Sequence, residues 1–407
     1  MTLEVSYHNC NFINELNLPN NNEKVINSIQ ETLGNLHSLN IVKNKELLNQ
    51  TILETLQFSK GKKNFIVFGT GGSNLGAKAL INILQGGEKV NIFFYDNIDP
   101  INFENSISKI DLRSTGIIVI SKSGSTPETL SQYACLIEIF DQKNELSTLF
   151  NNSLIITEDK RSPLASIAHK NKCTILNHED DIGGRFSIFS NVGMVPSILA
   201  GLDVKKIHEG VLEELNYQKN FDFLKIAQFF RYQTAKPFLA NSVIMTYSDA
   251  LFYFGKWYLQ LWAESIGKNN KGITAIHSVG TTDQHSQLQL YLNGPRDKFF
   301  TFITTNHANK GLQLHNKTME ENEINYLVNK KMGDLMQAEQ KATIDTFKLN
   351  KFSFRQIHLK NINEFSIGQL MAFSIMETIA ACIYFEVDPF TQPAVEQGKE
   401  LTKQYLS

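Results

Sequence analysis

The sequence predicts an α/β protein with two domains, each containing a parallel β-sheet flanked by helices. The first observation behind this prediction is a repeated order along the chain: a short apolar run, a loop rich in Gly, Ser and Thr, and then an amphipathic helix. This alternation is typical of parallel sheets, which are covered on both faces. The second observation is length, because 407 residues exceed the roughly 250 to 300 residues at which a single core stops growing.

The elements follow from local hydrophobic patterns. Residues 1–60 are predicted to form a helical lead-in, because Val25, Ile29 and Leu33 share one helical face and strand patterns are weak there. Beyond this lead-in, short apolar runs bounded by polar loops predict buried strands. These runs are residues 65–68, 117–120, 154–156, 243–247, 299–303 and 354–359.

The strands fall into two groups that define the expected domains. We expect the first domain over residues 61–200 and the second over 201–388, with the boundary near residues 201–206 although no Pro- or Ser-rich linker marks it. Residues 389–407 are polar and helical in pattern. This last segment is expected to return and pack on the body of the protein.

Composition disfavours several classes of partner and suggests a cytoplasmic protein with reduced cysteines. The chain has 39 Lys and Arg against 41 Asp and Glu, with no run of like charge, which disfavours nucleic acid or an anionic membrane as a partner. Its 4 cysteines show no CxxC pair, so neither a zinc cage nor a disulfide framework is expected. The start of the chain lacks a signal-peptide pattern, and the longest apolar run, residues 370–385, is interrupted by Glu377.

The loop SKSGSTPET, residues 121–129, is the first candidate binding site. Its hydroxyl groups and Lys122 precede a helix that is expected to begin with Pro127, and Ser125 or Thr126 is the predicted N-cap, with Glu128 completing a capping box. Free N–H groups and the positive end of the helix dipole suit a phosphate dianion. Such loops also cap helices without any ligand, so the loop alone leaves both interpretations open.

The loop GTGGSNLG, residues 69–76, does not fit the familiar nucleotide motifs. A dinucleotide fingerprint would need Gly where Asn74 stands, and a Walker A loop would need Lys where Ala77 stands. What remains is a tight glycine turn that permits close backbone approach, with Ser73 at the start of a helix. A simple helix cap is the alternative interpretation.

Candidate acid–base residues stand out only by their surroundings. HExxH, EF-hand and GxSxG patterns do not occur, so no metal is expected. Glu264 lies near the end of an aromatic helix, where a carboxylate opposes the helix dipole. His285 follows Thr282 and Asp283 near a predicted helix start, and each of these residues alone has an ordinary structural explanation. Arg185 and Lys399 are weaker still when taken singly.

Taken together, the motifs carry a family resemblance. GTGGSNLG, SKSGSTPET, GGRFS, QLWAESIGK, GTTDQHSQLQ and TQPAVEQGK occur in the order that marks the phosphoglucose isomerase family, and the chain resembles its compact bacterial form from about residue 64 to residue 405. The resemblance implies two sugar isomerase (SIS) domains, each an αβα sandwich with a parallel sheet, assembled as a homodimer. It also implies that residues 389–407 contribute to the active site.

The resemblance assigns roles to single residues. Glu264 matches the base that shuttles a proton between C2 and C1 through a cis-enediol, and Arg185 matches the arginine that stabilises the enediolate. Lys399 and His285 match the ring-opening pair, with His285 reaching the site from the partner subunit. Those chemical types suit the roles, because proton abstraction next to a carbonyl needs a base and a positive group near the oxygen. The residues that match substrate and phosphate contacts are Gly72, Ser73, Ser121, Lys122, Ser123, Ser125, Thr126, Gln260 and Gln392.

Three functions are carried forward from the sequence. The leading hypothesis is reversible isomerisation of glucose 6-phosphate and fructose 6-phosphate, in glycolysis and gluconeogenesis, without a metal or redox cofactor. A wider enzyme that also accepts mannose 6-phosphate is the second. A sugar-phosphate-binding regulator without catalysis is the third, and the joint presence of Glu264, His285, Lys399 and Arg185 argues against it.

Overall fold

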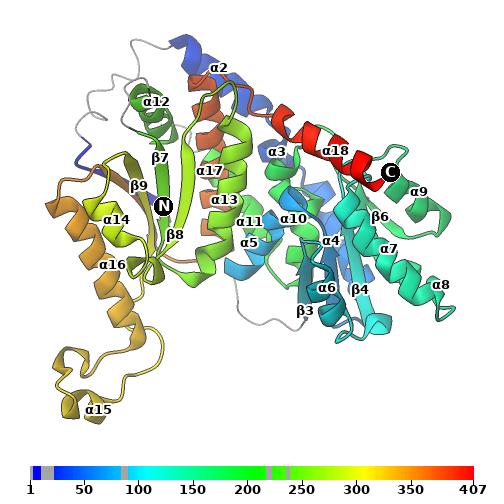
Figure 1. The fold of residues 1–407 in the computed structure, drawn as a ribbon, viewed down its shortest axis with the longest axis horizontal. Helices are drawn as coiled ribbons and strands as arrows, with labels where there is room; N and C mark the ends of the chain where they lie inside the picture. Colours follow the sequence, from blue (N-terminus) through cyan, green and yellow to red (C-terminus); the bar gives the residue numbers. More distant parts are fainter. Residues whose placement is uncertain (1–2, 11–22, 84–89, 217–221, 235–238) are drawn as a thin grey trace.

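The protein contains two five-stranded sheets with helices on their faces and between them (Figure 1). The computed structural model describes residues 3–10, 23–83, 90–216, 222–234 and 239–407. The predicted α/β architecture and its two separate sheets are therefore confirmed. Parts of the predicted lead-in and second domain, residues 11–22, 217–221 and 235–238, lie outside the described residues.

The first sheet is wholly parallel, with the order β3-β2-β4-β5-β6. Its central strands are buried on both faces, as continuous apolar runs require. The three predicted runs of this half of the chain coincide with β2, β4 and β5, whereas β3 and β6 were not predicted. The strands are β2 (Asn64–Phe68), β3 (Asn91–Tyr95), β4 (Thr115–Ile120), β5 (Ser153–Thr157) and β6 (Thr174–Asn177).

Helices cover both faces of the first sheet. One face packs on side chains from α4 and α10, including Phe58, Val192 and Val195. The other face packs on α6, α7, α8 and α9, through residues such as Tyr133 and Leu164. The helices are α4 (Lys45–Ser59), α6 (Pro100–Ile107), α7 (Pro127–Asp141), α8 (Leu146–Asn151), α9 (Pro163–Lys170) and α10 (Asn191–Leu199).

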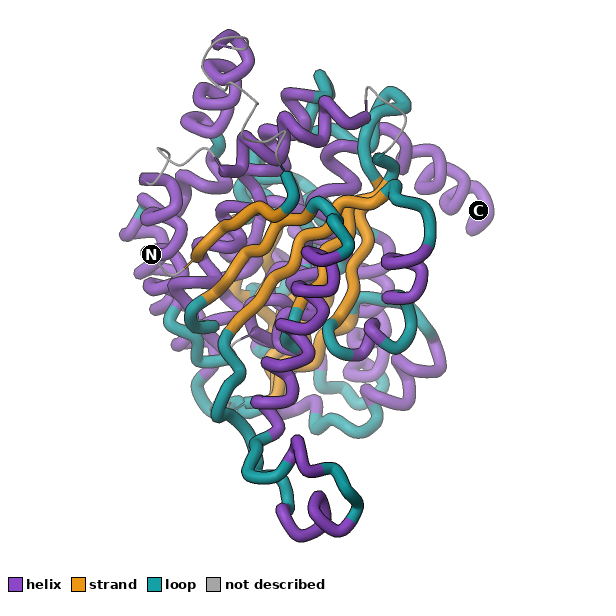
Figure 2. Tube along the Cα trace, turned by 90° about the vertical axis from the view of Figure 1, so that its left-hand side faces the viewer, coloured by secondary structure: helices purple, strands orange, loops and turns teal. Residues whose placement is uncertain are grey.

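The second sheet has the order β1-β10-β9-β7-β8 and is parallel except at β1. Figure 2 shows strands lying side by side beneath their covering helices. The strand β1 (Leu3–His8) pairs antiparallel with β10, so the prediction of a wholly helical lead-in is wrong for these residues, and this sheet is mixed. Its other strands are β7 (Asn241–Thr246), β8 (Thr274–Val279), β9 (Lys298–Thr305) and β10 (Phe354–Leu359).

The second sheet is also covered on both faces. Its outer face packs on α14 (Leu288–Asn293) and α16 (Met332–Leu349), and its inner face on α12 (Asp222–Thr234), α13 (Phe252–Ile266) and α17 (Glu364–Tyr384). Long, apolar α17 could span a membrane by composition alone, yet 94% of its apolar window is buried inside the protein. It is therefore a core helix. The helices between the sheets and near the N-terminus are α2 (Glu23–Asn35), α3 (His37–Asn40), α5 (Leu75–Ile83) and α11 (Val204–Asn216).

Strand order locates the place where a ligand can enter. In the first sheet β2 lies between β3 and β4, so the connections after β2 and after β4 leave in opposite directions. Ligands of open α/β sheets bind at such a switch point, outside the carboxyl ends of the strands. The two loops singled out from the sequence, residues 69–76 and 121–129, follow these two strands.

Two helical segments leave the compact body. A short segment that contains α15 (Asn316–Glu321) projects away from the second sheet in Figures 1 and 2. The C-terminal helix α18 (Glu396–Leu406) runs past the first sheet with every residue exposed. The expectation that residues 389–407 pack on the body thus fails for α18, although Pro389 is buried.

Candidate active site

Two glycine turns meet at the carboxyl edge of the first sheet. The turn Gly71–Ser73 follows β2, and the turn Gly184–Phe189 follows β6. A Cβ atom on Gly72 would lie closer than 3.0 Å to backbone atoms of Gly184 and Arg185. The close backbone approach predicted for the first loop is therefore confirmed, and its partner is the loop that carries Arg185.

Arg185 is held in place by side chains from distant parts of the chain. Its Nε donates to Ser265 Oγ at 2.9 Å, and its Nη1 donates to Glu264 Oε2 at 3.3 Å and to Gln392 Oε1 at 3.0 Å. Arginine's planar fork of donors suits such a fixed arrangement. The structure thus brings Arg185, Glu264 and Gln392 together.

Backbone carbonyls complete the shell around the same guanidinium. Its Nη2 donates to Pro389 O in a short hydrogen bond and to Thr391 O at 3.4 Å. The Arg185 side chain is only 4% exposed. Contacts with residues 389–392 therefore bind the start of the C-terminal segment to the site.

Glu264 lies in the last turn of α13, as expected. Gln260, one turn earlier, donates from Nε2 to Glu264 Oε1 at 3.0 Å, and its own Oε1 is buried without a hydrogen-bond partner among the described residues. The Glu264 side chain is 33% exposed, so a ligand can reach it. A Cβ atom on Gly71 would lie 2.8 Å from Gln260 Nε2, which places the first glycine turn directly against this pair.

Two cations lie at the site, the buried Arg185 and the partly buried Lys268. Burial lowers the pKa of the Arg185 guanidinium, while the Glu264 carboxylate opposes that shift. Burial also lowers the pKa of Lys268, with a further contribution from Arg185. Lys268 Nζ donates to Glu264 O at 2.8 Å and to Ser265 O at 2.5 Å. Cations held in a partly desolvated position stabilise negative charge that develops beside them.

The predicted phosphate loop presents hydroxyl groups before α7. Ser121 Oγ and Thr126 Oγ1 lie 2.8 Å apart, and Ser125 Oγ donates to Ser123 Oγ at 3.0 Å. Thr126 is the N-cap residue of α7, but its side chain makes no capping hydrogen bond. The predicted capping box with Glu128 is therefore wrong, because the Thr126 hydroxyl bonds within the loop and Glu128 stands one position too early. The first N–H groups of α7 have no side-chain cap.

Lys122 is directed away from these hydroxyls. Its Nζ donates to Asp180 O at 2.6 Å and lies 3.6 Å from Glu158 Oε1. Ser73 stands in the opposite loop, partly exposed at the end of the turn Gly71–Ser73. The backbone thus brings the predicted binding loops to one edge of the sheet, with the Lys122 ammonium occupied elsewhere.

His285 does not join the Arg185–Glu264 cluster. Trp262, beside Glu264, donates to Ile273 O just before β8 at 2.8 Å, and the other end of α13 packs Gly255 against His277 within β8. Helix α13 therefore runs antiparallel to β8, and His285, which follows the end of β8, lies at the helix end opposite Glu264. Its side chain is exposed.

The turn that carries His285 is fixed by its neighbours. Asp283 Oδ2 accepts a hydrogen bond from Val279 N at 2.6 Å, and Gln284 Nε2 donates to Tyr247 OH at 2.7 Å and to Thr343 Oγ1 at 2.5 Å. His285 thus extends outward from a rigid turn.

Lys399 also stands apart from the cluster. Its Nζ donates to Glu396 Oε1 at 2.7 Å on the exposed surface of α18, and its side chain is 56% exposed. The helix begins only a few residues after Gln392, which does contact Arg185. Lys399 therefore lies on a segment anchored at the site, without touching Arg185 or Glu264.

Sequence reasoning missed several groups that complete the site. Ser265 and Lys268 lie within the motif WAESIGK, so their place in that motif was a usable signal. The carbonyl groups of Pro389 and Thr391 could not be predicted, because every residue has a backbone carbonyl and the residue type does not show which one will accept a hydrogen bond. Within the described part of the chain, no group of three or more His, Cys, Asp and Glu residues is arranged to hold a metal ion.

A pocket of about 1210 Å³ lies elsewhere, between α6 and α7. Its walls include Phe103, Ile107, Cys135 and Ile139. Most of the pocket surface is apolar, its Arg113 is already paired with Glu145, and its lining residues belong to neither glycine turn. The pocket does not suit a sugar phosphate, whose recognition requires convergent polar groups, so the geometry favours the Arg185–Glu264 cluster as the active site.

Comparison with known proteins identifies the family. Residues 56–407 match the family model described as phosphoglucose isomerase. Glucose-6-phosphate isomerase of Methanocaldococcus jannaschii is 31% identical over 98% of each chain, and that of Campylobacter jejuni is 34% identical over 87% of this chain and 88% of the relative. A hypothetical protein from Thermus thermophilus superposes with a TM-score of 0.90 at 25% identity, over 99% of this chain and 100% of the other. The chain belongs to the phosphoglucose isomerase family.

Proposed function

We propose that this chain catalyses the reversible isomerisation of glucose 6-phosphate to fructose 6-phosphate, a step of glycolysis and gluconeogenesis. The observation that carries the proposal is the contact between the buried Arg185 guanidinium and the accessible Glu264 carboxylate, 3.3 Å apart. This pair lies beside the switch point of the first sheet, where a ligand is expected. Curated relatives with this activity support the substrate assignment.

The pair supplies the groups that proton transfer at C1 and C2 needs. Glu264 removes the hydrogen bound to C2 of the open-chain aldose, leaving a cis-enediolate, and returns a proton to C1 to form the ketose. Arg185 neutralises the negative charge that develops on the oxygens. Gln260 and Gln392 hold the carboxylate and the guanidinium respectively, so both reacting groups are oriented before substrate arrives.

The loop after β4 anchors the phosphate in this proposal. The uncapped N–H groups of α7 and the hydroxyls of Ser121, Ser123, Ser125 and Thr126 offer donors to a dianion. The backbone of Gly72 and the hydroxyl of Ser73, in the loop after β2, are proposed to contact the phosphate from the other side of the switch point. Binding energy from this remote group orients C1 and C2 relative to Glu264.

Ring opening is assigned to Lys399 and His285 on the strength of the family resemblance. One group must donate a proton to the ring oxygen and another must accept the proton of the C1 hydroxyl, while the bond between C1 and the ring oxygen breaks. His285 follows β8 and lies near the end of α13 opposite Glu264, too far away to serve Glu264 of its own chain. We therefore propose a homodimer in the cytoplasm, in which His285 completes the site of the partner.

The variant Glu264→Gln tests the proposal. It keeps the shape of the side chain and its contact with Arg185, but removes the base. We expect kcat to fall by about 100-fold or more, the lower range of a general base's contribution, while hexose phosphate still binds. The measurements are a coupled isomerase assay in both directions and titration calorimetry with sugar phosphate.

A matched control is Glu209→Gln, which makes the same chemical change at an exposed position on α11. It is expected to leave kcat unchanged. Equal turnover by the Glu264→Gln enzyme and the wild type would remove Glu264 as the base. Mannose 6-phosphate is offered in the same assay to test the substrate range. If its turnover is comparable to that of glucose 6-phosphate, the enzyme has the wider specificity that includes mannose 6-phosphate.

A further inference from the structure

The side chain of Lys122 links two loops at the edge of the first sheet. It starts in the loop after β4, and its Nζ donates to Asp180 O, in the loop after β6, at 2.6 Å. Between these loops lies Glu158, directly after β5, with its Oε1 3.6 Å from the same ammonium. The Glu158 side chain is only 7% exposed. A buried carboxylate needs a cationic partner, and Lys122 is one of the two cations that lie beside Glu158 among the described residues.

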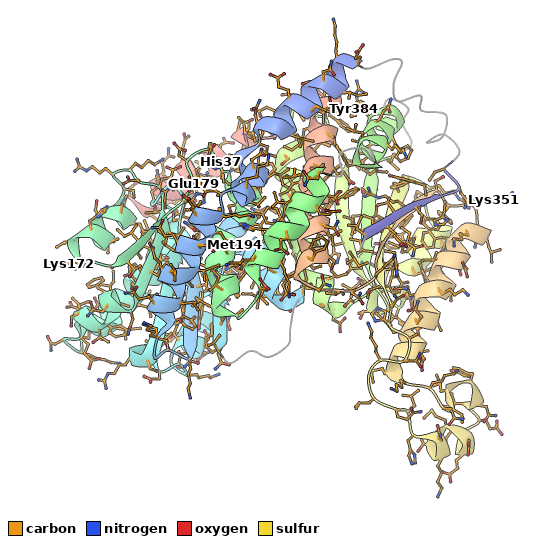
Figure 3. All side chains as sticks on the ribbon, turned by 180° about the vertical axis from the view of Figure 1, so that it is seen from behind. His37, Lys172, Glu179, Met194, Lys351 and Tyr384 are labelled. Carbon is orange, nitrogen blue, oxygen red and sulfur yellow. The ribbon has the colours of Figure 1, made fainter. Side chains whose placement is uncertain are left out.

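Backbone hydrogen bonds hold the same loops in register. Glu158 N donates to Lys122 O at 3.2 Å, and His178 N donates to Thr157 O at 2.9 Å. On the far side, His37 Nδ1 lies 2.7 Å from Asp181 Oδ1. Figure 3 shows His37 of α3 beside Glu179 in this loop. The loop after β6 is thus held at both sides before it reaches Arg185.

We propose that Lys122 and Glu158 act as positioning residues, forming a strap that sets the Arg185 loop relative to the phosphate loop. This inference rests on the proposed function, because it concerns the relative placement of its two halves. Lys122 then contributes through its contact with Asp180 rather than by touching the phosphate. Only a few residues separate Asp180 from Arg185, so a shift in one is transmitted to the other through the short turn at Gly183.

The strap matters because the site depends on alignment. The phosphate fixes one end of the substrate and Arg185 acts near the other, so any error in the distance between the two loops moves the reacting carbons relative to Glu264. A displacement of about 1 Å is enough to cost roughly 100-fold in rate. Loss of the strap should therefore lower kcat more than it weakens binding of phosphate.

The test uses Lys122→Met, which keeps most of the stem and removes the ammonium, and Glu158→Gln, which removes its counter-ion. The matched control is Lys160→Met, because Lys160 is the other cation that contacts Glu158 and its side chain is 58% exposed. Three quantities are measured in the full-length enzyme: kcat, the inhibition constant of inorganic phosphate, and hydrogen exchange of the amides in residues 180–185.

Lys122→Met and Glu158→Gln should each lower kcat by about 10-fold or more through misalignment, and should speed amide exchange in residues 180–185. The inhibition constant of inorganic phosphate should change by less than about threefold, because the phosphate donors stay in place. Lys160→Met should alter each quantity by less than about twofold, because the Lys160 side chain is itself exposed and Lys122 still lies beside the Glu158 carboxylate.

The opposite pattern of effects on kcat and on phosphate binding would contradict the proposed positioning role of Lys122. If Lys122→Met raises the phosphate inhibition constant by about 10-fold or more while kcat and exchange stay unchanged, Lys122 is a direct phosphate ligand. If Lys122→Met does not fold, Glu158→Gln tests the strap by the same three measurements: unchanged kcat and unchanged amide exchange in Glu158→Gln would contradict the strap. A wild-type enzyme without isomerase activity would remove the proposed function, whereas the exchange measurement would still test whether Lys122 holds the loop.

Discussion

At the scale of single residues, Gly72 shows how little space the site allows. Its turn lies against the peptide between Gly184 and Arg185, and a Cβ atom there would approach backbone atoms closer than 3.0 Å. Backbone cannot rotate away as a flexible side chain can. The absence of a side chain at Gly72 therefore sets the position of Arg185.

Gly72→Ala should consequently harm both stability and rate. Overpacking of this kind costs about 1–3 kcal/mol, and the displaced Arg185 should lower kcat. Urea unfolding and the isomerase assay measure the two effects. The control is Gly34→Ala in α2, where an added Cβ meets nothing within 4 Å, so that a gain of about 0.5–1 kcal/mol is expected. An alanine at position 72 with native stability and activity would show that the two turns do not touch in solution.

The sequence predicted part of this arrangement. A tight glycine turn was expected at residues 69–76, because consecutive glycines permit close backbone approach. Its contact with Gly184 was not predictable without the resemblance, since no local pattern says which distant loop will approach. The N-cap at Thr126 was one of two predicted positions. The predicted capping box needed Ser125 as the N-cap, three residues before Glu128, and it is absent because the helix begins one residue later.

At the scale of elements, the strands divide into those that sequence could and could not reveal. The strands β2, β4, β5, β7, β9 and β10 were predicted, and each lies between two neighbours in its sheet. The four missed strands, β1, β3, β6 and β8, are the four sheet edges. Edge strands are partly exposed, as the alternating burial of β3 illustrates, so they lack the continuous apolar run that marks an interior strand.

Helix α17 contains the polar residue that interrupted the longest apolar run of the sequence. Glu377 is paired with Arg355 of β10, with Oε2 2.5 Å from Nη1, and both side chains are almost fully buried, with exposures of 1% and 3%. Tyr258 of α13 donates to Glu377 Oε1 at 3.2 Å. Three elements are thus joined by one buried polar network, and burial followed by the Glu377 charge raises the pKa of Tyr258 well above its usual range.

Glu377→Ala should therefore destabilise the protein strongly. It leaves the Arg355 guanidinium buried without its counter-charge, which costs about 3–5 kcal/mol. The control is Glu321→Ala, which breaks the exposed pair with Lys317 and should cost less than about 1 kcal/mol. Denaturant unfolding of both variants measures the difference. A similar loss in the two would mean that the buried pair adds no more than a surface pair.

At the scale of the whole molecule, segments that are neighbours in the sequence do not always belong to the same half of the fold. The predicted lead-in is divided between the two halves, because β1 joins the second sheet while α4 packs on the first. The Arg185–Glu264 contact likewise joins the two predicted domains. Pairings across such long sequence separations leave no local pattern. The α/β architecture with two sheets was therefore predictable from local patterns, but the path of the first residues was not.

In the proposed mechanism, the site needs a residue from a second chain. Helix α13 has 15 residues, which corresponds to about 22 Å at 1.5 Å per residue, and Glu264 and His285 lie toward its opposite ends. A two-fold dimer can bring His285 of one protomer to Glu264 of the other, since each contact is then repeated by symmetry. The exposed His285 on its rigid turn fits this arrangement.

Mixing two inactive variants tests this sharing directly. In a dimer of one Glu264→Gln chain and one His285→Ala chain, the first chain lends an intact His285 to the second chain's intact Glu264. One of the two sites is then complete, so isolated mixed dimers should have about half of the wild-type activity, and a random mixture about a quarter, for a symmetric dimer. If His285 instead served its own chain, both sites of the mixed dimer would stay defective. The control is each variant alone, carried through the same unfolding and refolding. Mixed dimers are isolated by two different tags, so that a lack of isomerase activity cannot be caused by failed assembly.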